Sequence, residues 1–163
     1  DQVTLRHLEE IVKARTQILI ATPQLHHAVI VEQLIAAAKR GVRVVVLVPE
    51  FNSDPQWMSR EFLLERQNQL IDGGVEIYSY LPKPLDVKAA TFDGRVAILG
   101  SAPLNGTSMD ELMLCVPDAR FTREVNERIM KPGLANSTRR ERVSRGRLRR
   151  LKTRLFRAVN NRL

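Results

Sequence analysis

Cysteine and histidine are scarce in this chain of 163 residues, which has one cysteine, Cys115, and three histidines. A single cysteine excludes an intrachain disulfide, and the scattered histidines do not provide the ligand spacings of a zinc site. We therefore expect no metal ion and no cofactor. The sequence also lacks a long apolar run, so no segment is expected to span a bilayer. The residues that follow Asp1 lack a basic region with an apolar stretch behind it, and we expect no signal peptide.

Positive charge is concentrated near the C-terminal end. The whole chain has 26 lysines and arginines against 18 aspartates and glutamates, a net charge of +8. Residues 139–163 contain ten arginines and Lys152 against Glu141, a net charge of +10, which leaves −2 for residues 1–138. The globular part is therefore not expected to be a basic nucleic-acid-binding surface.

The globular domain is expected to end after a helix over residues 119–130. Lys131-Pro132-Gly133 follows this helix and is a typical helix-ending sequence. Asn136-Ser137-Thr138 is then expected to be a linker. We assign residues 1–133 to the domain and residues 134–163 to a basic tail.

Alternating helical and strand patterns predict an α/β domain. Apolar residues recur at helical spacing before a short apolar strand at residues 17–21, and a second helical face over residues 30–38 ends at Gly41. The valine-rich stretch 42–48 is typical of a central parallel strand. A third helix and a strand over residues 75–80 follow. This order predicts right-handed crossovers and a mixed, largely parallel sheet flanked by helices.

Asp93-Gly94 is a turn signal between two apolar stretches, and it predicts a β-hairpin. Around this hairpin, one residue separates Asp86 from Lys88, four separate Lys88 from Asp93, and six separate Asp93 from Gly100-Ser101. The turn alone is a sufficient reason for an aspartate at position 93. Asp86 and Lys88, two residues apart on one strand, are expected to face the same way and to form an ion pair.

This spacing resembles the signature of the phospholipase D superfamily, in which a histidine stands at the place of Asp86. The resemblance covers about residues 3–116 and is strongest to one half of a cardiolipin synthase-type enzyme. It implies that the absent histidine would attack phosphorus, that Lys88 would hold phosphate oxygens, and that two such halves face each other. A carboxylate at position 86 would repel an anionic substrate and pair with Lys88 instead.

The resemblance assigns the site residues and also shows where this chain departs from the family. Pro103 stands at the place of a phosphate-binding asparagine and Thr107 at that of an arginine, so the phosphate site is expected to be incomplete. The implied catalytic positions are Asp86 (at the place of the histidine), Lys88, Asp93 and Glu111, and the implied phosphate-binding positions are Lys88, Ser101, Asn105 and Ser108.

Two adjacent histidines, His26 and His27, follow the first strand. Loops at this end of an open α/β sheet commonly bind ligands, and the resemblance also places substrate-contacting residues here. The loop is therefore a candidate binding element, and solvent-exposed loop histidines are the alternative. His7 is expected on the exposed side of the first helix.

Beyond Gly146, leucines recur every three or four residues among arginines, which predicts a basic amphipathic C-terminal helix. Such a helix can lie on an anionic membrane, pack against the domain or a partner, or form an arm that contacts nucleic acid. The membrane is favoured, and the resemblance to cardiolipin synthases favours it further. The membrane-binding residues are predicted to be Arg147, Arg149, Arg150, Lys152, Arg154, Leu155, Phe156 and Arg157.

The predicted function is that of a phosphatidyltransferase or phosphodiesterase half-domain in membrane phospholipid metabolism, impaired because its motif lacks the histidine. It would need a second phospholipase D-like half, either from a homodimer or from a region that precedes Asp1. Its predicted place is the cytoplasm, peripheral to the inner or plasma membrane. The alternatives are a non-catalytic scaffold and a nuclease-like module that binds nucleic acid.

Overall fold

The computed structural model describes residues 2–50, 57–82, 85–102, 104 and 111–143, without the side chains of residues 57–63. In chain order its elements are α1 (Gln2–Lys13), β1 (Gln17–Ala21), α2 (Ala28–Lys39), β2 (Arg43–Pro49), α3 (Trp57–Asp72), β3 (Glu76–Tyr80), β4 (Ala89–Phe92), β5 (Val96–Gly100), β6 (Met113–Val116), α4 (Ala119–Val125), the π-helical turn η2 (Asn126–Met130), α5 (Lys131–Ala135) and β7 (Ser137–Arg139).

The described strands form one seven-stranded sheet in the order β6-β5-β4-β1-β2-β3-β7. The predicted mixed α/β fold with flanking helices is confirmed. The prediction of a largely parallel sheet is wrong, because only β1–β2 and β2–β3 are parallel among the six pairings of the described strands. The cause is the hairpin, whose strand β4 pairs directly with β1 in the antiparallel sense and is extended by β5 and β6.

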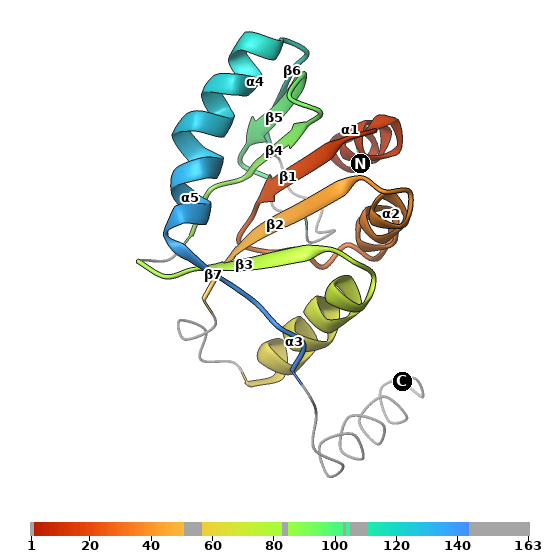
Figure 1. Ribbon diagram of the computed structural model, residues 1–163, viewed down its shortest axis with the longest axis vertical. Coiled ribbons are helices and arrows are strands. Elements are labelled where there is room, and N and C mark those ends of the chain that lie inside the picture. Colours follow the sequence, from red (N-terminus) through yellow and green to blue (C-terminus); the bar gives the residue numbers. More distant parts are fainter. Residues whose placement is uncertain (1, 51–56, 83–84, 103, 105–110, 144–163) are drawn as a thin grey trace.

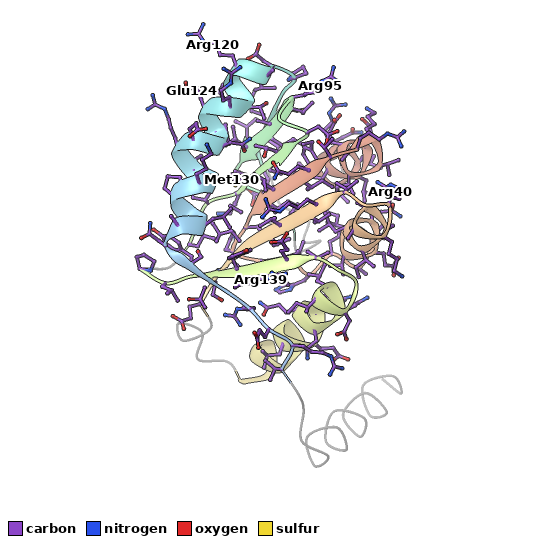
Figure 2. All side chains as sticks on the ribbon, viewed as in Figure 1. Arg40, Arg95, Arg120, Glu124, Met130 and Arg139 are labelled. Atoms are coloured by element: carbon purple, nitrogen blue, oxygen red, sulfur yellow. The ribbon has the colours of Figure 1, made fainter. Side chains whose placement is uncertain are left out.

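Helices cover both faces of the sheet (Figure 1). α1, α2 and α3 lie on one face, where Leu34 and Leu70 join Val46 in the larger apolar cluster. The continuous helical stretch α4–η2–α5 crosses the other face, where Met130 packs with Leu47 in a smaller cluster. Figure 2 shows Met130 between this helical stretch and the sheet.

Two turns adopt the positive backbone angles that their residues favour. Gly41 ends α2 with a φ of +90°, and Asp93 and Gly94 have φ angles of +52° and +64° at the hairpin turn. Consecutive positive φ angles give the twist that a two-residue hairpin needs, and an Asp-Gly pair adopts them at low cost. The predicted hairpin is therefore present, and it carries the motif.

The end of the domain differs from the prediction. The helix does not end at Lys131-Pro132-Gly133 but continues as α5 to Ala135, so a boundary between residues 133 and 134 would fall inside α5. The π-helical turn η2 ends at Met130, two residues before Pro132, and such a turn widens the helix where a proline ring would otherwise clash with it. The expected linker over residues 136–138 is also wrong, because residues 137–139 form β7.

The described part of the basic segment is anchored to the domain. β7 pairs antiparallel with β3, and the N–H of Arg140 donates to the carbonyl of Ile77 at 2.7 Å. Arg142 Nε lies 2.9 Å from Asp72 Oδ1, and Val143 exchanges two hydrogen bonds of 3.0 Å with the Asn68 side chain. Residue 143 therefore lies at the end of the sheet where β3 begins.

The first helix has one unexpected buried residue. His7 is 2% exposed and its Nδ1–H donates to the carbonyl of Val3 at 2.8 Å, so its predicted exposure is wrong. It shares the packed face of α1 with Glu10 and Ile11. Within the described residues, no helix is both long and apolar enough to cross a membrane.

Candidate functional site

The motif residues lie at the edge of the sheet where β1, β2, β3 and β5 end and β4 and β6 begin. Lys88 precedes β4, and its carbonyl accepts a hydrogen bond of 3.2 Å from the N–H of Gly100 at the end of β5. The next residue, Ser101, donates its N–H to the carbonyl of Leu112 at 3.0 Å. The hairpin and β6 thus bring three separated parts of the motif to one edge.

Asp86 and Lys88 form the expected ion pair. Lys88 Nζ lies 2.6 Å from Asp86 Oδ1 and 3.2 Å from the carbonyl oxygen of Asp86. The lysine side chain is 16% exposed, whereas that of Asp86 is 88% exposed. A solvent-facing carboxylate therefore pairs with the ammonium group of a largely buried lysine side chain.

Ser101 and Glu111 form a second pair beside the first. The Ser101 hydroxyl donates to Glu111 Oε2 and accepts a hydrogen bond of 3.1 Å from the N–H of Leu112. Within the described residues, no hydrogen bond or ion pair joins Lys88 to Ser101 or Glu111. The structure thus brings the lysine and the serine to one edge but leaves each with an acidic partner of its own.

Gly100 allows the close approach of β6 to this edge. A Cβ atom at this position would overlap the carbonyl oxygen of Leu112 and the Met113 sulfur, and it would lie 2.9 Å from Met113 Cα. Backbone atoms cannot move away as a flexible side chain can, so a side chain here would push β6 off β5. The glycine therefore fixes the position of Ser101 relative to Glu111.

The loop with the two histidines is tied to the segment that follows the motif. The N–H groups of His26 and His27 both donate to the carbonyl of Leu104, at 2.8 Å and 3.2 Å, and Leu25 forms a parallel bridge with Leu104. Burial lowers the pKa of His26, and the nearby Arg66 guanidinium lowers it further. The lowered pKa favours the neutral form of this imidazole, which belongs to the candidate binding loop. The anchoring role of Leu104 could not be predicted from the sequence, because a backbone carbonyl accepts hydrogen bonds whatever side chain its residue carries.

Asp93 is not part of this cluster. It lies at the opposite end of β4, where its carboxylate accepts backbone hydrogen bonds from Arg15, Thr16 and Gln17 at 2.8–2.9 Å and one from the Thr16 hydroxyl at 2.9 Å. The N–H of Asp93 also donates to the Gln17 carbonyl at 2.8 Å. This position supports the turn role that was the alternative interpretation of Asp93. It does not support a role beside Lys88 and Ser101.

Several predicted site residues lie outside the described part of the chain. These are Asn105, Ser108, Pro103, Thr107 and the membrane-binding set Arg147, Arg149, Arg150, Lys152, Arg154, Leu155, Phe156 and Arg157.

Comparisons with known proteins agree with this fold and motif. A family model described as "Cardiolipin synthase, PLD-like domain" matches residues 7–131. Minor cardiolipin synthase ClsB of Bacillus subtilis (strain 168) is 31% identical over 123 residues, which are 73% of this chain and 30% of that protein. Nuc of Salmonella typhimurium, a phospholipase D family member of known crystal structure, superposes with a TM-score of 0.70 at 17% identity, over 85% of this chain and 90% of that chain. TrmBL2, an archaeal chromatin protein, superposes with a TM-score of 0.56 at 18% identity, over 86% of this chain and 51% of that chain.

The fold is therefore that of the phospholipase D superfamily. Within it, this chain belongs to the family of cardiolipin synthase, PLD-like domains. It spans only 24–30% of the length of the curated cardiolipin synthases that it matches.

Proposed function

We propose that this chain is a phospholipase D-like half of the cardiolipin synthase type whose own motif is inactive, and that it acts in membrane phospholipid metabolism beside a partner half. The observation that carries the proposal is the 2.6 Å ion pair between Lys88 and Asp86. Asp86 stands at the place of the family's nucleophilic histidine. The aspartate at position 86 therefore takes the place of the nucleophile, and its carboxylate also pairs with the lysine that would bind phosphate.

An aspartate does not replace the histidine in this setting. Enzymes that form an acyl phosphate supply a cation to offset the added negative charge. Here the cation within reach of Asp86 is Lys88, the group that the phosphate itself would need. Among the described residues, a phosphodiester that approaches this edge meets the ammonium group of Lys88 beside the carboxylates of Asp86 and Glu111.

A turnover assay tests the inactive site. The full chain is incubated with bis-p-nitrophenyl phosphate, phosphatidylglycerol vesicles and single-stranded DNA, beside the variants Lys88→Ala and Asp86→His. We expect no turnover above background from any of the three proteins, because Pro103 and Thr107 also replace phosphate-binding groups. Turnover by the natural chain that disappears in Lys88→Ala would overturn the proposal. Activity gained by Asp86→His would show that position 86 is the sole defect.

A binding assay tests the cause. Asp86→Asn should bind inorganic phosphate up to about fivefold more tightly than the natural chain by titration calorimetry, because an exposed ion pair contributes roughly 0.2–1 kcal/mol. Glu124→Gln is a matched control, because it removes an exposed carboxylate that pairs with Arg128 on α4. Equal phosphate affinity in Asp86→Asn and the natural chain would show that Asp86 does not occlude Lys88.

Membrane attachment at the cytoplasmic surface is the second part of the proposal. Its support is the +10 net charge of residues 139–163 and the leucine spacing beyond Gly146. Nucleic acid is the second candidate for this basic segment. The same charge favours it, and TrmBL2 is described as having a novel mode of DNA binding. Cosedimentation with anionic vesicles in competition with duplex DNA at physiological salt distinguishes the two.

A further inference from the structure

Four exposed arginines from separate parts of the chain gather at the end of the sheet opposite to Lys88 and Ser101, where β1, β2 and β3 begin and β4 ends. We call this set the arginine end, and it consists of Arg15, Arg40, Arg43 and Arg95. Backbone contacts join their segments. The N–H of Arg43 donates to the carbonyl of Thr16 at 3.0 Å, and the N–H of Arg15 donates to Asp93 Oδ2 at 2.9 Å. Figure 2 shows Arg40 and Arg95 on the same outer side of the molecule.

Negative charge only partly offsets the arginine end. The Asp93 carboxylate lies among the four arginines and accepts backbone N–H groups of residues 15–17, and the Glu76 carboxylate pairs with Arg43 at 2.9 Å. The six side chains sum to a charge of +2. Within the part of the chain that the structure describes, the other three arginines have no carboxylate at ion-pairing distance, and the Arg40 guanidinium donates to two carbonyl groups at the end of α1 instead.

The opposite edge of the sheet carries charge of the opposite sign. Its described residues include the carboxylates of Asp86, Glu111 and Glu50 against the ammonium group of Lys88. From Lys88 to Asp93 the two ends lie about 17 Å apart at the rise of a strand. The net charge of −2 on residues 1–138 therefore hides a separation of charge along the strands. Composition could not reveal it, because the four arginines come from three distant stretches of sequence.

Apolar side chains lie beside the arginines. Val12 is 54% exposed, and its carbonyl accepts a hydrogen bond from the Arg40 guanidinium. Val143 is 43% exposed and lies at the same end of the sheet, where its N–H donates to the Asn68 side chain. The basic segment with the leucine spacing follows Val143 in the chain, so it starts from this end too. Arginines around apolar side chains suit the boundary between lipid phosphates and acyl chains, whereas the backbone of nucleic acid offers no apolar counterpart.

We propose that the arginine end is the surface with which the domain contacts an anionic lipid bilayer, so that Lys88 and Ser101 face away from the membrane. The inference rests on the membrane attachment of the proposed function and adds to it a contact surface and an orientation. Each arginine near an anionic leaflet contributes about 1 kcal/mol, or about fivefold in affinity. Four such contacts are too weak to hold the domain on a vesicle alone. The basic segment therefore supplies most of the affinity, and the arginine end sets the orientation.

Vesicle binding by the full chain tests the surface. Arg15→Gln/Arg95→Gln is the informative double variant, because neither side chain has a hydrogen bond or ion pair within the described residues, so the melting temperature should stay unchanged. The variant should bind phosphatidylglycerol–phosphatidylcholine vesicles about fivefold to 25-fold more weakly than the natural chain, and the difference should shrink at high salt. Arg123→Gln/Arg128→Gln is the matched control. It removes the same charge from the exposed side of α4–η2 and should weaken binding by less than about twofold.

Quenching of an attached dye tests the orientation. A dye on Val12→Cys in a Cys115→Ser background should be quenched by lipids that carry a quencher on the headgroup. A dye on Leu112→Cys in the same background should not be quenched, because Leu112 is 80% exposed beside Ser101 at the opposite edge. Quenching at position 112 without quenching at position 12 would place the motif on the bilayer and overturn the inference.

The binding assay separates the inference from the proposed function. Equal vesicle affinity of the natural chain and Arg15→Gln/Arg95→Gln would overturn the inference and leave attachment by the basic segment standing. No vesicle binding by the natural chain would refute both. A double variant that loses affinity for duplex DNA but not for vesicles would assign the arginine end to nucleic acid and also overturn the inference. None of these outcomes depends on turnover, so the inactive motif is tested separately.

Discussion

Replacing Asp93 with alanine tests whether this motif residue holds the fold or serves the site. The carboxylate accepts three backbone hydrogen bonds and one hydroxyl hydrogen bond from the segment that leads into β1. Asp93 also has a φ of +52°, which alanine adopts at a cost of about 1 kcal/mol. The change therefore removes four contacts and adds backbone strain at the same residue.

The expected loss of stability is about 3–5 kcal/mol for Asp93→Ala. Each hydrogen bond is taken at roughly 0.5–1 kcal/mol, because the donors, most of them exposed, can bond to water in the variant. Asp93→Asn keeps one acceptor oxygen and tolerates the positive φ, so it should cost only about 1–2 kcal/mol. In a chain of this size, the alanine variant should lower the melting temperature by roughly 10 °C.

The pH dependence gives an independent check of the same contact. Desolvation by burial raises the pKa of Asp93, but the hydrogen bonds from Gln17, Thr16 and Arg15 outweigh it, and the net pKa lies below its ordinary value. A lowered folded-state pKa contributes stability above the unfolded value of about 3.9 and loses it as the pH falls through the folded value. The stability difference between the natural chain and Asp93→Asn should therefore shrink on acidification below about pH 4.

Urea unfolding followed by far-ultraviolet circular dichroism at pH 7 measures these differences, and phosphate titration is the companion assay. A structural Asp93 predicts a large loss of stability in the alanine variant and an unchanged phosphate affinity in the asparagine variant. If Asp93→Ala costs less than about 1 kcal/mol while phosphate binding is lost, the residue serves the site and our assignment is wrong.

Three further changes test other parts of the structure. Burial lowers the pKa of His7, and this effect outweighs the opposing effect of its hydrogen bond to Val3. The stability of the natural chain should therefore fall as the pH drops below the unfolded pKa of about 6.5. His7→Gln should flatten this decline in melting curves recorded from pH 7.5 to 5. Gly100→Ala should cost roughly 1–3 kcal/mol in urea unfolding because its Cβ meets backbone, whereas Gly133→Ala meets only the end of the Leu47 side chain and should cost less. Truncation after Val143 should keep the melting temperature and abolish sedimentation with anionic liposomes, whereas truncation after Asn136 should also lower the melting temperature because it removes β7. A shorter chain that unfolds after the Val143 cut would show that the tail packs on the domain.

Local chemistry was predictable wherever one stretch of sequence decides the outcome. The valine-rich stretch predicted β2, Gly41 predicted the end of α2, and Asp93-Gly94 predicted the hairpin turn. The ion pair of Asp86 and Lys88 followed from their spacing alone, although both residues precede β4 rather than lying on it. In each case the interacting groups are neighbours in the chain.

Predictions failed where a partner distant in sequence decides the outcome. Residues 137–139 are polar, and they form a strand because the edge of β3 is available for pairing. No pattern within these residues predicts that pairing. The burial of His7 depends on where α1 packs. The anchoring of residues 15–17 by Asp93 depends on the pairing of β4 with β1, and the same pairing makes the sheet less parallel than expected.

The remaining motif residues divide by what the fold needs from them. The Asp93 carboxylate accepts hydrogen bonds from the segment that leads into β1, and the absence of a side chain at Gly100 lets the backbone of β6 approach closely. The fold would therefore need both residues even in a domain without any activity. Their presence is therefore weak evidence for catalysis. Positions 86, 103 and 107, where the family signature supplies chemistry, are the ones that carry other residues in this chain. Lys88 is the most informative of these residues, because its side chain is 16% exposed and its ion-pair partner within the described residues is Asp86. A buried cation without Asp86 would need another anion, and at this edge of the sheet a phosphate oxygen fits that need.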